Sequence, residues 1–142
     1  MMQPTIMEWS KCQREFMRKV EKDPERVESI ILKAKQRLHR AQHTAVTEET
    51  VSFIVEDYYE VIKELLVAYL LKAGLRSKNH QCLISYFYLK NPIYEKEAII
   101  IAQMSYFRNR LEYYGESVPL DFYHKNKEEF MKIIRIIEKL LL

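Results

Sequence analysis

The feature that most constrains the fold of this chain is a long helical pattern of apolar residues over positions 51–71. From position 65 to 71 the apolar character extends around the whole helix, so this end must be buried on most sides. We predict a central bundle helix of about 26 residues that begins after Thr47. Side chains spaced as on one helical face define the pattern, and they are Val51, Ile54, Tyr58, Val61, Ile62, Leu65 and Tyr69.

Glycine and proline lie only between the helical patterns. The chain has two glycines and four prolines in 142 residues, which leaves little material for turns. Gly74 and Gly115 are placed where a left-handed residue would end a helix. Asp23 and Pro24 suit the N-cap and first turn of another helix. These positions divide the chain into helices with short connections.

Five further helices are predicted around the central one. No stretch alternates with a period of two for long enough to indicate a half-buried strand. The predicted fold class is therefore all-α, an antiparallel up-and-down bundle of four to six helices, with residues 1–142 in a single domain. The further helices are expected at about 5–20, from 24 to beyond 41, 80–89, 95–114 and from 119 to the C-terminus.

Charge and cysteine content exclude several classes of protein. A formal net charge of +3 excludes a histone-like polycation. Cys12 and Cys82 lie far apart without a paired motif, so we expect reduced, packed thiols in a cytoplasmic protein. The longest uncharged run, residues 98–107, falls short of the roughly 20 residues that span a bilayer, so we expect neither membrane insertion nor export.

The most specific motif closes the predicted fifth helix. Arg108 and Asn109 follow an apolar segment and resemble the motif of HEPN domains, in which an arginine and a small polar residue precede a histidine near the end of a late helix. Here Tyr113 stands where that histidine is expected. A phenol with an ordinary pKa near 10 cannot readily replace an imidazole as a proton acceptor at neutral pH. The resemblance therefore implies a degenerate ribonuclease motif.

The similarity to HEPN proteins extends upstream over roughly residues 47–115. It includes the segment 58–65, Gly74, and His80 at the start of the next helix. The resemblance implies a homodimer that binds RNA or a nucleotide, or docks on a minimal nucleotidyltransferase, and family members often act in toxin-antitoxin or defence modules. It implies no metal and no cofactor.

Two other functions stay open at this stage. One is an active, metal-independent endoribonuclease, in which Arg108 and Asn109 suffice or His80 enters the site. The other is a structural helical adaptor, in which Arg108 forms an ion pair with Glu112 one turn away while Tyr113 packs. We predict Arg108, Asn109 and Tyr113 as the binding residues, with His80, Arg37 and Arg40 as accessory candidates, and no catalytic residue is assigned.

A basic run at positions 33–43 is a second candidate for nucleic-acid binding. Lys33, Arg37 and Arg40 share a helical face that a phosphate backbone could contact. The interpretation we favour is that acidic residues of the next helix neutralise this face. Arg37 and His43 also match the arginine-to-histidine spacing of the family, but on the wrong helix, so we treat the match as coincidence. The acidic residues are Glu48, Glu49, Glu56, Asp57 and Glu60.

Histidines and tyrosines give weaker indications of a metal site and of base stacking. His39 and His43 have the spacing of two metal ligands on a helix, but no local carboxylate or thiol completes the set and nearby arginines repel a cation. We expect no metal site. The tyrosines could stack on bases, although core or interface positions are the favoured interpretation. They are Tyr58, Tyr59, Tyr86, Tyr88, Tyr106, Tyr113 and Tyr114.

Overall fold

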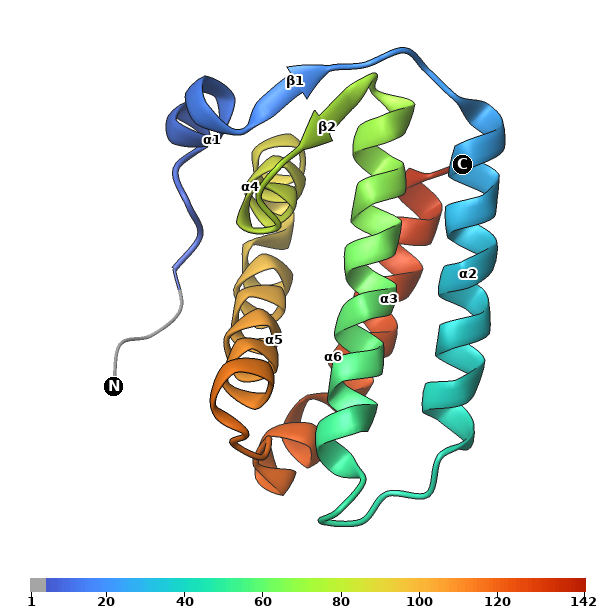
Figure 1. The fold of residues 1–142 in the computed structure, drawn as a ribbon, viewed down its shortest axis with the longest axis vertical. Coiled ribbons are helices and arrows are strands. Elements are labelled where there is room, and N and C mark those ends of the chain that lie inside the picture. The colour runs from blue at the N-terminus through green and yellow to red at the C-terminus, as the bar shows by residue number, and fades with distance from the viewer. Residues whose placement is uncertain (1–4) are drawn as a thin grey trace.

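A computed structural model describes residues 5–142 and contains six α-helices and one two-stranded sheet in that range (Figure 1). The predicted all-helical bundle is confirmed. In chain order the elements are α1 (Trp9–Glu15), β1 (Met17–Lys19), α2 (Pro24–His43), α3 (Val51–Lys72), β2 (Leu75–Ser77), α4 (Gln81–Lys90), the short 3-10 helix η1 (Pro92–Tyr94), α5 (Glu95–Tyr114) and α6 (Leu120–Leu140).

The centre of the bundle is α3, as predicted. It contacts α2, α5, α6 and α4, and most of its residues are buried. The helix is shorter than expected because residues 47–50 form a turn before it. Within this turn, the Thr47 N–H donates to Oγ1 of Thr50 at 2.8 Å and the Thr50 N–H donates to Oγ1 of Thr47 at 3.1 Å.

Local signals in the sequence correctly predict most helix ends. The Asp23 side chain accepts a hydrogen bond from the Arg26 N–H, which caps α2. Gly74 and Gly115 follow α3 and α5 with φ values of 73° and 65°. A left-handed backbone of this kind is accessible to glycine at little cost.

The first helix and the neighbouring connection differ from the prediction. A helix was expected over residues 5–20, but α1 ends at Glu15 and the next residues form β1, which pairs antiparallel with β2. The register joins Met17 to Ser77 and Lys19 to Leu75. The expectation that no strand occurs is therefore wrong. The apolar spacing of these residues also fits a helix, but their backbone N–H and C=O groups form hydrogen bonds with β2 instead.

The expectation of two reduced thiols is also wrong. Cys12 of α1 and Cys82 of α4 are both buried and form a disulfide across 70 residues of sequence. The helical pattern placed each cysteine on a buried face, but it could not show that the two faces meet. The disulfide and the β1–β2 pair fasten the N-terminal segment to α4 and to the end of α3 (Figure 1).

The remaining helices follow the expected ranges.

Within residues 5–142, no helix has both the length and the apolar character needed to cross a bilayer. The core lies between α3 and its neighbours, and its large, fully buried side chains include Phe87, Phe130, Ile62 and Met104.

Candidate functional site

Arg108 lies on the C-terminal half of α5, where its side chain is 18% exposed and lies beside α3. One guanidinium nitrogen is 3.3 Å from Oε2 of Glu112, which is the ion pair expected from their spacing. The other is 3.4 Å from Oε1 of Glu60 on α3, a partner that the sequence did not indicate. Arg108 therefore bridges two helices.

The three residues of the predicted site differ in burial. Asn109 is half-buried, and its Oδ1 accepts a hydrogen bond from Nη1 of Arg108 at 3.4 Å. Tyr113 is 73% exposed, so the alternative in which it packs is wrong. Arg108 and Asn109 thus belong to the α3–α5 junction, whereas Tyr113 belongs to the open surface at the end of α5.

Arg108 and four charged side chains around it, Glu56, Glu60, Lys63 and Glu112, form what we call the ionic cluster. Lys63 Nζ lies 2.5 Å from Oε2 of Glu60, so this carboxylate is held by two cations. Burial raises the pKa of Glu56, and the nearby Glu112 carboxylate raises it further. Three carboxylates against two cations leave the cluster with an excess of negative charge.

His80 immediately precedes α4 and lies within electrostatic range of the ionic cluster. His80 is exposed, but partial desolvation by the surrounding protein lowers its pKa, and the positive charges of Lys63 and Arg108 lower it further, although Glu60 acts in the opposite direction. The imidazole is therefore neutral at neutral pH and able to accept a proton. The structure brings this predicted accessory residue into the neighbourhood of Arg108.

We expect an NMR titration to give a midpoint for His80 below the ordinary histidine value of 6.5. In a Lys63→Met variant the midpoint should rise, because one of the charges that disfavours the imidazolium is gone. Since the unfolded chain binds this proton more tightly than the folded chain, acidification through about pH 6.5 should lower stability. A wild-type midpoint at or above 6.5 would contradict this placement of His80.

Two arginines of the basic run of α2 are paired with carboxylates of α3. One partner, Asp57, belongs to the acidic set expected from the sequence, and the other, Glu64, does not. Arg40 donates to both oxygens of Asp57, at 2.9 and 2.6 Å. Arg37 Nε donates to Glu64 at 3.1 Å, and Nη1 of Arg37 lies 3.8 Å from Asp57. The two arginines proposed as accessory residues are thus engaged with α3, and the paired carboxylates are largely buried.

The histidine pair of α2 has no partners for a metal. The rings of His39 and His43 stack with centroids 4.0 Å apart. Within the described part of the chain, no group of three or more histidine, cysteine or acidic side chains could hold a metal ion.

The tyrosines divide into two sets. Tyr58, Tyr59 and Tyr86 are buried, and Tyr88 and Tyr106 are half-buried, which agrees with the packing interpretation. Tyr113 and Tyr114 are 73% and 68% exposed. The guanidinium of Arg110 lies 4.3 Å from the ring centroid of Tyr114 and also pairs with Glu116. The end of α5 is therefore a surface of exposed rings beside an arginine.

Comparison with known protein families, curated proteins and solved structures gives no match for this chain. The HEPN resemblance accordingly stays a prediction that depends on Arg108, Asn109 and their surroundings. The homodimer and the nucleotidyltransferase partner stay predictions as well.

Proposed function

We propose that this chain is a HEPN-type protein that binds single-stranded RNA at the C-terminal end of α5 without cleaving it. The observation that carries the proposal is the pair of exposed rings, Tyr113 and Tyr114, directly after the Arg108-Asn109 motif. Exposed aromatic rings stack on unpaired bases, and neighbouring arginines add cation–π and phosphate contacts. Arg110 lies against Tyr114 but is paired with Glu116, so the two rings carry the proposal.

The absence of cleavage follows from how Arg108 is held. Its guanidinium is paired with Glu60 and Glu112, so little of its charge is available to stabilise a phosphate in a transition state. The residue in the place of the family's histidine is Tyr113, an exposed phenol that does not readily accept a proton at neutral pH. The proposed role is therefore recognition.

One observation favours a second candidate, a metal-independent ribonuclease that uses His80. Its lowered pKa keeps the imidazole neutral, as a general base requires, and Arg108 lies within electrostatic range. Against this candidate, the excess of carboxylates in the ionic cluster repels a phosphate. The leading proposal therefore has RNA bind outside the cluster.

Replacing both exposed tyrosines with alanine is expected to weaken single-stranded RNA binding by at least about tenfold, since stacking contributes roughly 1–3 kcal/mol per base. Fluorescence anisotropy with a labelled oligonucleotide measures the loss. The matched control is Tyr113→Phe with Tyr114→Phe, which keeps both rings and should keep most of the affinity. Equal loss in the two double variants would contradict stacking as the mode of binding.

The rival functions are separated by the state of the RNA after incubation in EDTA. The proposal expects intact RNA with the wild-type protein. Cleavage that disappears in both His80→Ala and Arg108→Ala would establish the ribonuclease instead. If the wild-type protein binds no RNA at all, the structural adaptor is favoured.

A further inference from the structure

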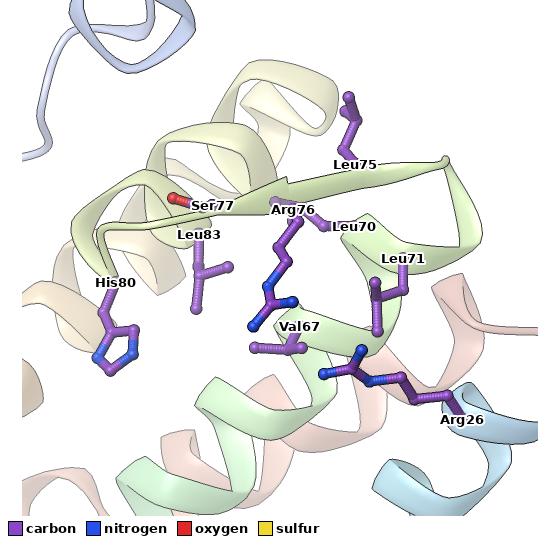
Figure 2. A pocket seen from close by; sticks show the side chains of 9 residues that line it. All are labelled: Arg26, Val67, Leu70, Leu71, Leu75, Arg76, Ser77, His80 and Leu83. Atoms are coloured by element: carbon purple, nitrogen blue, oxygen red, sulfur yellow. The ribbon is translucent and has the colours of Figure 1, made fainter. Parts of the chain in front are cut away.

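A cavity of about 170 Å³ lies under β2, between the first turn of α2 and the last turns of α3 (Figure 2). Its apolar wall comes from Val67, Leu70 and Leu71 of α3 and from Leu83 of α4. The polar residues that line it are Arg26, Arg76, Ser77 and His80. In Figure 1 this region lies toward the opposite end of the bundle from the C-terminal end of α5.

Arg26 and Arg76 give the cavity a positive charge. Arg26 of α2 and Arg76 of β2 direct their guanidinium groups toward the same opening (Figure 2). Within residues 5–142 neither forms an ion pair, and no carboxylate lines the cavity.

Arg18 and Arg135 also form no ion pair within residues 5–142, so what sets Arg26 and Arg76 apart is that both line the same cavity. Arg37, Arg40, Arg108 and Arg110 are all paired with carboxylates. Two guanidinium groups that face one opening repel each other, and an anion between them would remove that cost. The cavity therefore has the positive charge of an anion-binding site, and no carboxylate of the described residues lines it.

We propose that this cavity binds the phosphate group of a small phosphomonoester, held between Arg26 and Arg76 with His80 at its edge. Guanidinium groups present planar pairs of donors that match phosphate oxygens. The cavity is smaller than the roughly 300–1,000 Å³ of pockets that enclose a drug-sized ligand, so it takes the phosphate and leaves the remainder of the ligand outside. The site is separate from the proposed RNA surface at the end of α5.

Isothermal titration calorimetry with inorganic phosphate, AMP and adenosine tests the proposal. Phosphate and AMP should bind and adenosine should not, because recognition is through the phosphate. Tighter binding of AMP than of phosphate identifies a phosphomonoester as the ligand, whereas equal binding identifies free phosphate. Arg26→Gln and Arg76→Gln should each weaken AMP binding by about tenfold, as expected for loss of a charge-assisted contact.

The control variant is Arg135→Gln, which removes an exposed arginine of α6 outside the cavity and should leave AMP binding unchanged. Because Arg26 and Arg76 are exposed, both variants should fold, which circular dichroism checks. The proposal is overturned if adenosine binds as well as AMP, if phosphate and AMP do not bind, or if all three variants behave alike. RNA binding of the tyrosine variants is measured separately, so failure of one proposal leaves the other intact.

Discussion

Replacing Cys12 with serine is expected to lower the free energy of unfolding by about 4 kcal/mol, the largest effect that we predict. The disulfide with Cys82 closes a loop across 70 residues of sequence, and its loss frees that segment in the unfolded chain. Urea denaturation of the oxidised wild type and of the Cys12→Ser variant measures the difference. The loss is a large part of the 5–15 kcal/mol by which domains are usually stable.

Two controls attribute this loss to the covalent link. Cys82→Ser should lose about as much as Cys12→Ser, and the wild type with a reductant should behave like either variant. Hydrogen exchange should show α1 and β1 opening first in the variants, because the β1–β2 pair is then the main backbone connection of this segment. Two reactive thiols in the native, non-reduced protein would contradict the disulfide.

The Arg108→Met variant is expected to lose about 2 kcal/mol at pH 7, the second-largest effect. Removing one partner of a mostly buried ion pair leaves the other charge uncompensated. The ionic cluster would then contain three carboxylates, those of Glu56, Glu60 and Glu112. Its one remaining cation would be Lys63. Thermal or chemical denaturation of the variant beside the wild type measures the loss.

The pH dependence separates charge from packing in this variant. Arg108 counteracts the raised pKa of Glu56, so without it this folded-state pKa rises further and the variant loses stability as pH rises through the carboxylate range. The difference from wild type should therefore shrink at about pH 4. Arg110→Met, which breaks an exposed pair on the same helix, should change stability little at either pH. An equal loss for Arg108→Met at both pH values would mean that packing alone is responsible.

The sequence predicts those parts of the fold that depend on neighbours in the chain. The Asp23 cap, the glycine at each of two helix ends and the apolar pattern of α3 are local signals, and the helices follow them. The short strands and the disulfide depend on residues about 60 and 70 positions apart, and no local pattern specifies which of them meet. These were the features that the prediction lacked.

The same division holds for the candidate site. The Arg108–Glu112 pair follows from one-turn spacing, and the neutralisation of Arg40 by Asp57 follows from opposite charges on successive helices. The approach of Glu60 to Arg108 depends on how α3 and α5 are rotated about their axes, which the sequence does not specify. The cavity between Arg26 and Arg76 depends on four elements at once, α2, α3, β2 and α4, and neither arginine belongs to a motif.

An NMR titration of the labelled protein with a short single-stranded RNA in EDTA tests the central proposal most directly. We expect shifts concentrated in residues 108–115 at the end of α5, with the RNA intact on a denaturing gel of the same sample. Either the absence of shifts in this segment or the shortening of the RNA would contradict it.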